Sequence, residues 1–318
     1  SVIFDEDPNS PTYKEVLDTL WGETQYLNKQ KNYYHKPAFN FQHLWNINEK
    51  TSLTNVFYYS TGKGGGTDLE GGQILYTDNN QIDFQAIYDS NSGNDWGIAW
   101  TGGPGIDLEY SDTETKSTNI LRAAVNNHYW GGFLSTFNYK INKSLDLASG
   151  LDFRTYKGEH YREVYDLLGG DYYVGSTVVE SSTEAPDNFI GFNSDNILLR
   201  EGDKIKYHND GVVRWGGAFG QLEYNYGDIS AFINITGSQT LYKRIDYFKK
   251  HDLVLPDTIL VQAVGINDVI NYNGSEYTIN SKEARHAETD WEAFPGFTFK
   301  TGANWNIDES NNIFINTG

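Results

Sequence analysis

The sequence predicts an all-β protein built from long antiparallel hairpins, and three observations lead to this fold class. Apolar and polar residues alternate with a period of two in four pairs of neighbouring segments, as in strands with one apolar and one polar face. The link inside each pair has hairpin length, whereas the segments between pairs are long. No charged residue falls on the apolar face of these segments. We therefore expect one β unit with short turns at one edge and tall loops at the other.

The clearest pair joins "FLSTFNYKI" (133–141) to "LDLASGLDFRTY" (145–156) through "NKS". One face of the second segment holds Leu145, Leu147, Leu151 and Phe153, and the other holds Asp146, Asp152 and Arg154. The remaining predicted hairpins join 37–45 to 51–60, 217–226 to 229–237, and 297–307 to 312–318.

The apolar faces of these strands suit lipid better than a protein core. The predicted strands have about the length that crosses a bilayer when tilted. Aromatic residues stand at the strand ends near the short turns, where a membrane barrel has its interfacial girdle: Trp45, Tyr139, Tyr224 and Trp305. Because lipid tolerates no unpaired strand edge, the fold is predicted to be an antiparallel up-and-down transmembrane β-barrel.

The faces opposite to the apolar ones carry the charged residues of the strands. Asp152, Arg154, Glu223 and Lys300 all fall there, and we expect them to face the lumen of the barrel. The alternative left open is a soluble or surface β-rich protein, either a glycan-binding module or a glycosidase, which would bury the same apolar residues in its core.

Three long segments, about 61–125, 157–211 and 241–290, are predicted to be extracellular loops. They hold most of the acidic residues, and "EYTINSKEAR" (276–285) has the composition of a small strand within one of them. The candidate ligand contacts are the loop aromatics Trp96, Trp100, Tyr172 and Tyr173, since such rings stack on a sugar or an aromatic siderophore. Packing among the loops is the alternative role for these rings.

Composition excludes several classes of function. The chain has 318 residues and a formal net charge of −19, which argues against nucleic acid as a partner. It has no cysteine, and therefore no disulfide, thiolate metal site or cysteine nucleophile. It also lacks methionine and opens without a signal peptide, so we expect an internal piece of a longer protein.

The stretch "YYSTGKGGGT" (58–67) raises the question of a phosphate site, because a lysine stands among glycines. The P-loop pattern fails, since Gly64 follows Lys63 where Ser or Thr is required, and turn residues follow where a helix should start. We interpret Gly62–Gly66 as a bend where a strand leaves the membrane and its loop begins.

No other motif predicts catalysis. The histidines are scattered without zinc spacing. The acidic stretch "DLEYSDTETK" (107–116) lacks the calcium-loop pattern, and no nucleophile with a partner base is present. Two acids for glycoside hydrolysis could be imagined in Asp107 with Glu109, or in Asp146 with Asp152, but nothing in the sequence frames a cleft around them. We predict no enzyme activity, no catalytic residue, no cofactor and no metal ligand.

Four stretches carry a resemblance to a known family: "NYYHKPAFNFQHLWNINEKTSLTNVFYYSTGKGGGT", "HYWGGFLSTFNYKINKSLDLASGLDFRTYKGEHYREVYDLLGG", "GAFGQLEYNYGDISAFINITGSQTLYKRIDYF" and "ETDWEAFPGFTFKTGANWNIDESNNIFINTG". Together they resemble the TonB-dependent outer-membrane receptors of Bacteroidetes-type bacteria. The resemblance spans nearly the whole chain, is weaker in the loops, and its stretches are specific as a set rather than singly.

The resemblance implies a 22-stranded barrel with an N-terminal plug, which imports a scarce nutrient such as an iron complex or an oligosaccharide. Residues 1–318 would then form part of the barrel domain, without the plug and the remaining strands. The implied location is the outer membrane of a Gram-negative bacterium. The implied partners are the TonB energy-transducing complex, outer-membrane lipid and lipopolysaccharide, with a surface lipoprotein as a further candidate.

Overall fold

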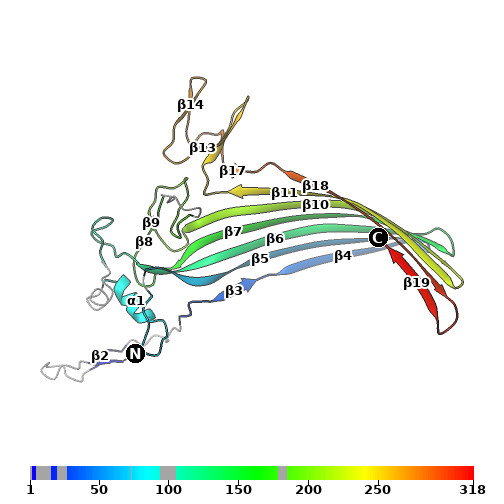
Figure 1. Ribbon diagram of the computed structural model, residues 1–318, viewed down its shortest axis with the longest axis horizontal. Helices are drawn as coiled ribbons and strands as arrows, with labels where there is room; N and C mark the ends of the chain where they lie inside the picture. The colour runs from blue at the N-terminus through cyan, green and yellow to red at the C-terminus, as the bar shows by residue number, and fades with distance from the viewer. Residues whose placement is uncertain (1, 5–15, 20–26, 73, 94–104, 178–184) are drawn as a thin grey trace.

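A computed structural model of the chain describes residues 2–4, 16–19, 27–72, 74–93, 105–177 and 185–318 (Figure 1). A curved antiparallel sheet runs along the molecule, with the long connecting segments gathered at one end and the short turns at the other. Within these residues, no helix has the length and apolar character needed to cross a membrane.

The sheet contains ten strands, all antiparallel, in the order β19-β18-β11-β10-β7-β6-β5-β3, with β4 also paired to β5 and β17 to β11. Their bounds are β3 Asn32–His35, β4 Ala38–Asn48, β5 Thr51–Gly71, β6 Asn119–Lys140, β7 Leu145–Asp166, β10 Lys204–Tyr226, β11 Ile229–Asp246, β17 Ala287–Glu288, β18 Glu292–Asn306 and β19 Asn312–Thr317. In the described residues the sheet is open, with β19 at one edge and β3 and β4 at the other.

The four predicted hairpins are confirmed as β4–β5, β6–β7, β10–β11 and β18–β19. Each turns within a few residues. The β10–β11 turn contains only Gly227 and Asp228, and the φ of Gly227, 57°, lies in the left-handed region that glycine adopts at little cost. The all-β, antiparallel fold class therefore follows from the alternation of the sequence.

The strands are longer than predicted. β5, β6, β7 and β10 contain 21, 22, 22 and 23 residues, so they extend well into the segments expected to be loops. The connections proper span 72–118, 167–203 and 247–291. The reason is that a ladder of backbone hydrogen bonds does not require an apolar face. Near the loops, ion pairs and small buried clusters take the place of the apolar face. The alternation of apolar and polar residues therefore fades from the sequence there.

The run Gly62–Gly66 lies inside β5, which corrects the interpretation of a bend at a strand end. β3 pairs with this run, Tyr34 opposite Gly64 and Tyr33 opposite Gly65. A Cβ at Gly64 would overlap the carbonyl oxygen of Tyr33 and the ring of Tyr34, and one at Gly62 would overlap the Tyr34 hydroxyl. The glycines thus allow the tyrosines of β3 to lie directly on the strand.

We expect Gly64→Ala to weaken the docking of β3 by about 1–3 kcal/mol, because the added methyl group meets backbone atoms that cannot move without breaking the ladder. Hydrogen exchange of the amides of residues 32–35 measures this loss. Gly211→Ala is the matched control, since a Cβ at Gly211 in β10 meets no atom within 4 Å. Equal exchange in the two variants would contradict the packing role of Gly64.

The long segments fold into small elements: α1 Phe84–Asn91, β8 Tyr173–Val174, β9 Leu198–Leu199, β12 His251–Val254, β13 Ile259–Val264, β14 Ile270–Tyr272, β15 Ser275–Tyr277 and β16 Ala284–Arg285, with β1 Val2–Phe4 and β2 Val16–Thr19 near the N-terminus. Strand structure is confirmed in the stretch 276–285. The sequence analysis missed α1, although Asp83 caps it by accepting a hydrogen bond from the Ala86 amide at 3.0 Å.

Two small apolar clusters join these elements to the loop end of the sheet. One contains Ile120, Val164, Leu167, Ile190, Leu199 and Ile205. The other joins Ile87 of α1 to Leu121 and Leu168. Toward the short turns, by contrast, the apolar side chains are exposed.

The strand register separates the sheet into two faces. Phe41, Phe57, Phe133 and Phe153 stand opposite one another in a row across four strands, and this row belongs to the apolar face. The next row, which includes Gln42 and Asp152, points to the other side and belongs to the polar face.

Candidate functional site

The polar face of the sheet is the candidate site, and it contains all four charged residues predicted to share a face. Asp152 and Arg154 of β7 form an ion pair at 2.5 Å, and the Arg154 guanidinium lies 4.8 Å from the centre of the Trp215 ring. Glu223 of β10 stands opposite Asp146. Lys300 of β18 stands opposite Asn234, whose amide donates to Gln221 at 3.0 Å. That this face lines a lumen stays a prediction.

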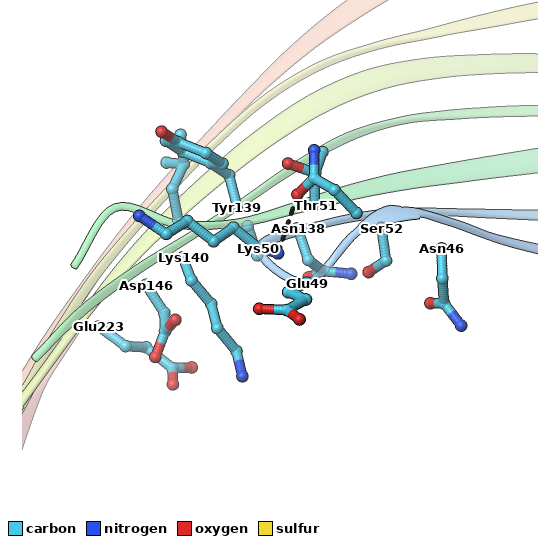
Figure 2. A pocket seen from close by; sticks show the side chains of 13 residues that line it. Asn46, Glu49, Lys50, Thr51, Ser52, Asn138, Tyr139, Lys140, Asp146 and Glu223 are labelled. Atoms are coloured by element: carbon cyan, nitrogen blue, oxygen red, sulfur yellow. Dashed lines mark hydrogen bonds between the residues drawn. The ribbon is translucent and has the colours of Figure 1, made fainter. Parts of the chain in front are cut away.

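Two hollows lie on the polar face near the short turns. The first has a volume of about 420 Å³, and its charged lining residues are Glu49, Lys50, Lys140, Asp146 and Glu223. Figure 2 shows Asp146 and Glu223 projecting from one side of the sheet and Tyr139 from the other. The second has a volume of about 510 Å³ and a mostly neutral polar lining that includes Gln221, Asn304 and Asn316. Mixed charges and amides of this kind bind polar groups without selecting one sign of charge.

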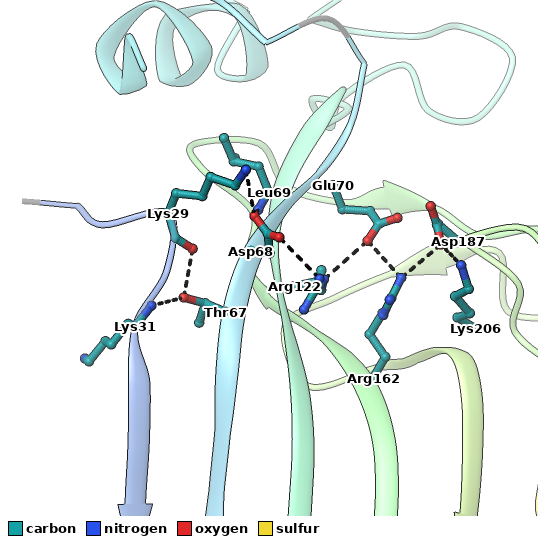
Figure 3. A network of polar contacts seen from close by, with 10 residues as sticks. All are labelled: Lys29, Lys31, Thr67, Asp68, Leu69, Glu70, Arg122, Arg162, Asp187 and Lys206. Atoms are coloured by element: carbon teal, nitrogen blue, oxygen red, sulfur yellow. Dashed lines mark hydrogen bonds and ion pairs between the residues drawn. The ribbon is translucent and has the colours of Figure 1, made fainter. Parts of the chain in front are cut away.

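At the loop end, a chain of ion pairs crosses the polar face (Figure 3). Arg122 of β6 lies 3.5 Å from both Asp68 and Glu70 of β5. Arg162 of β7 contacts Glu70 at 3.0 Å and Asp187 at 2.9 Å. Lys29 extends the chain to Asp68 at 3.2 Å, and Lys206 of β10 pairs with Asp187. We call these seven residues the rim network; it ties strands β5, β6, β7 and β10 to the segment that contains Asp187.

A shared proton shapes the electrostatics of the rim network. Burial, followed by a hydrogen bond with Asp187, raises the pKa of Glu70 from 4.5 to about 7, against the opposing effect of Arg162 and Arg122. The hydrogen bond from Glu70, followed by the attraction of Lys206 and Arg162, lowers the pKa of Asp187 to about 2. The proton of the pair therefore resides on Glu70, and the charge on Asp187.

A second polar cluster lies at the loop end of the opposite face. The buried Asp210 of β10 pairs with Lys157 at 2.9 Å and accepts a hydrogen bond from the Tyr247 hydroxyl at 2.7 Å. The Tyr247 ring stacks on His208 at 4.4 Å and contacts His286 at 4.7 Å. The described part of the chain contains no group of three or more His, Cys, Asp or Glu residues arranged to hold a metal ion.

The predicted ligand-contacting aromatics are placed as follows. Trp96 and Trp100 lie outside the described residues. The Tyr172 side chain is fully buried, with Arg200 over its ring at 5.8 Å, so its position matches the packing alternative. Tyr173 begins β8, is partly buried, and packs against the cluster around Ile190 and Leu199. Their role as ligand contacts stays a prediction.

The acidic stretch at 107–116 is held by its own residues. Asp107 pairs with Lys116 at 2.8 Å and accepts a hydrogen bond from the Glu109 amide at 3.1 Å. The hydrogen bond from Lys116 lowers the pKa of Asp107. A glycosidase acid needs the opposite shift, a raised pKa, so the arrangement does not favour Asp107 as a proton donor.

The rim network was not predicted from the sequence. Its signal is present, because Asp68 and Glu70 in β5 and Arg122 in β6 continue the period-two positions of the polar face beyond the predicted strand ends. Asp187 carries no such signal, since it comes from an irregular segment that only the fold brings to Arg162.

Comparison with known proteins adds a structural similarity. No family model matches the chain, and no curated protein matches it. Among solved structures, it is similar to the ferric-catecholate import receptor Fiu of E. coli K12. The open form gives a TM-score of 0.40 at 13% identity, over 90% of this chain and 35% of the receptor. The closed form gives 0.39 at 13% identity, over 90% and 32%. The chain thus spans about a third of the length of that receptor.

Proposed function

We propose that this chain is part of the barrel of an outer-membrane nutrient importer. The observation that carries the proposal is the apolar face between the short turns and the row of Thr155 and Arg214, which we call the apolar band. Its residues include Phe41, Leu151, Ile233, Phe297 and Ile315, with exposed fractions of 52%, 46%, 46%, 71% and 72%. The register adds no Asp, Glu, Lys or Arg to it in the described strands. One row of the band is polar in β4, β5 and β6, with His43, Asn55 and Ser135 hydrogen-bonded to one another. The exposed apolar surface on both sides of this row requires an apolar partner.

The height of the apolar band fits a bilayer. From Leu145 to Lys157, strand β7 rises roughly 40 Å along its axis. A tilt of about 45° reduces this to roughly 28 Å across a membrane, near the thickness of the hydrocarbon core. Cations begin at the upper limit with Lys157, Arg214 and Lys243, where lipid headgroup phosphates lie. Trp291 packs against Arg214 at 4.7 Å, as expected of an interfacial aromatic.

A soluble sandwich is the competing fold, and the exposure of the apolar band argues against it. A sandwich covers such a face with a second sheet about 10 Å away. Among the described strands, the smaller sheets are formed by the N-terminal residues and the connecting segments, and they gather at the loop end, where they leave the band uncovered (Figure 1). Lipid is the apolar partner that needs no further protein segment.

In the proposed barrel, the open sheet is closed by strands outside this chain. Both edges continue into further strands of a barrel of about 22, since lipid tolerates no open edge. The polar face, with Asp152, Arg154, Glu223 and Lys300, lines the lumen, and a plug outside this chain fills it and contacts the TonB complex. Outer-membrane lipid and lipopolysaccharide surround the barrel. A surface lipoprotein is a further candidate partner at the loops.

The cargo proposed is a scarce ligand such as an iron complex or an oligosaccharide, bound and transported without chemical change. The loop residues Trp96, Trp100, Tyr172 and Tyr173 remain the proposed capture surface. Because Tyr172 is buried, its contribution is to support Tyr173 and the loop, while Tyr173 and the tryptophans meet the ligand. The strongly negative chain disfavours anionic cargo.

Cysteine labelling of intact cells tests the topology, because the chain has no cysteine of its own. We expect a membrane-impermeant maleimide to label Glu276→Cys in the full-length receptor, since Glu276 is exposed in the distal β14–β15 hairpin. Lys143→Cys, in the β6–β7 turn, should be labelled only after the outer membrane is opened. Labelling of both from outside, or recovery of the receptor in the soluble fraction, would refute the proposal.

A further inference from the structure

The polar face carries a line of aromatic side chains that nothing above explains. Neighbouring strands contribute one ring each in two adjacent rows: Tyr58 from β5, Trp130 from β6, Tyr156 from β7, Trp215 from β10 and Tyr242 from β11. Phe294 of β18, opposite Thr240, extends the line at one end. Tyr34 of β3 extends the line at the other end, two rows closer to the loops. We call this line the aromatic belt.

Two pairs of belt rings are in contact, and other rings lie against the sheet. Trp130 meets Tyr156 with ring centres 5.5 Å apart, and Tyr242 meets Phe294 at 5.7 Å. Glycines provide the space. A Cβ at Gly132 would overlap the Tyr58 ring, and one at Gly217 would come within 2.6 Å of the Trp215 ring. Tyr58 and Trp215, which lie over these glycines, present a ring face to the space above the sheet, whereas the Trp130–Tyr156 and Tyr242–Phe294 pairs meet edge to face, at 63° and 72°.

Within this chain, several rings of the belt are exposed. Trp130 is 40% exposed, Tyr242 46% and Phe294 56%, although they stand on the polar face, where aromatic side chains gain nothing from lipid. The belt stands level with Thr155 and Arg214, the upper limit of the apolar band on the other face. In the proposed barrel, a ligand passing inward from the loops meets the belt before it meets the hollows near the short turns.

Polar groups accompany the rings, and their charges cancel. Arg154 covers Trp215 and is neutralised by Asp152. On the loop side, His128 bonds the Tyr156 hydroxyl at 2.5 Å and His160 bonds the Asn126 amide oxygen at 2.6 Å. An anionic ligand, such as a ferric catecholate, would find the Arg154 guanidinium beside the rings already paired with Asp152, within a strongly acidic chain. A neutral ligand with apolar faces and hydroxyl edges matches both the rings and the polar groups.

We infer that the aromatic belt is a binding site for neutral saccharides. Pyranose rings would stack on Trp130, Trp215 and Tyr242, while Asp152, Arg154 and His160 would bond their hydroxyl groups. This inference rests on the proposed function, and it specifies the class of cargo. It also gives the cargo a second site, between the capture loops and the lower hollows.

Calorimetric titration of the purified full-length receptor tests the inference, with maltohexaose, cellohexaose, mannohexaose and xylohexaose as probes. We expect at least one to bind. Trp130→Ala and Trp215→Ala should each weaken that binding about tenfold, as for an aromatic anchor in an interface. Trp130→Phe should restore most of it. Trp305→Ala, on the exposed apolar face, is the matched control and should leave affinity unchanged.

Several results would overturn the inference. Binding of none of the four hexasaccharides, or equal affinity in the belt and control variants, would exclude a saccharide site. Binding of ferric 2,3-dihydroxybenzoate that is lost in Trp130→Ala would assign the belt to an anionic aromatic cargo instead. A lower unfolding temperature with unchanged sugar affinity would mean that the belt packs against the rest of the receptor. In each case the cysteine labelling pattern would still report separately on the importer itself.

Discussion

Replacing Ile233 with arginine is expected to destabilise the folded sheet by about 2–4 kcal/mol in a lipid bilayer. Ile233 is exposed in the middle of the apolar band, opposite Leu222 on one side and Thr301 on the other. A charged side chain there has no partner and cannot reach water. Urea-dependent folding of the full-length receptor into lipid vesicles, followed by tryptophan fluorescence, measures the loss.

The neighbouring residue supplies the control for this substitution. Asn234 projects from the polar face and bonds Gln221, so Asn234→Arg should cost less than about 1 kcal/mol even with Lys300 opposite it. Leu151→Arg, on β7, should repeat the large penalty. Similar losses for Ile233→Arg and Asn234→Arg would mean that the two faces meet the same solvent, as in a soluble protein.

The contrast between Ile233 and Asn234 is visible in the sequence because the apolar and the polar face of the sheet demand different side chains at alternate positions. This demand ends where the apolar band ends. Above it, β5 continues through Gly62–Gly66 to Gly71, and no alternation marks the strand. The pairing there depends on Tyr33 and Tyr34 of β3, a short strand that lies next to the glycines only after folding. The half of each hairpin next to its short turn was therefore predictable, and the half next to the long connections was not.

The candidate site divides in the same way. Asp152, Arg154, Glu223 and Lys300 follow from strand parity alone, and the register brings them to one face. Tyr172 was chosen for its ring chemistry, and ring chemistry does not distinguish a loop surface from a small core; only its contacts with the folded loop do. The alternation of side chains also predicts that the rings of the aromatic belt share the polar face. Aligning them into one line, however, requires the register of seven strands, and that register depends on where the strands end.

The rim network allows the second large prediction, in which Arg162 is replaced by methionine. Glu70 and Asp187 would lose the guanidinium that contacts both at about 3 Å, and Glu70 is nearly buried. Removing one partner of a buried ion pair costs about 3–5 kcal/mol, and we expect a smaller loss of about 2 kcal/mol, because the charge that Arg162 contacts is on Asp187, which is half exposed, and Arg122 remains near Glu70. Both carboxyls lie beyond the apolar band, so the loss should appear locally, as faster hydrogen exchange in residues 185–192 with the lower strands unchanged.

Hydrogen exchange in residues 185–192 should also depend on pH, and the proton shared by Glu70 and Asp187 sets the sign of this dependence. Because the pKa of Glu70 is raised from 4.5 to about 7, its contribution to stability is fully present below pH 4.5 and is lost as the pH rises through about 7. Exchange in residues 185–192, corrected for its intrinsic pH dependence, should therefore accelerate between pH 6 and 8. Glu70→Gln keeps a hydrogen-bond donor to Asp187 without a titrating proton and should remove the acceleration, whereas Glu276→Gln, in the exposed β15, should not. An acceleration that persists in Glu70→Gln would mean that another group holds the segment to the sheet.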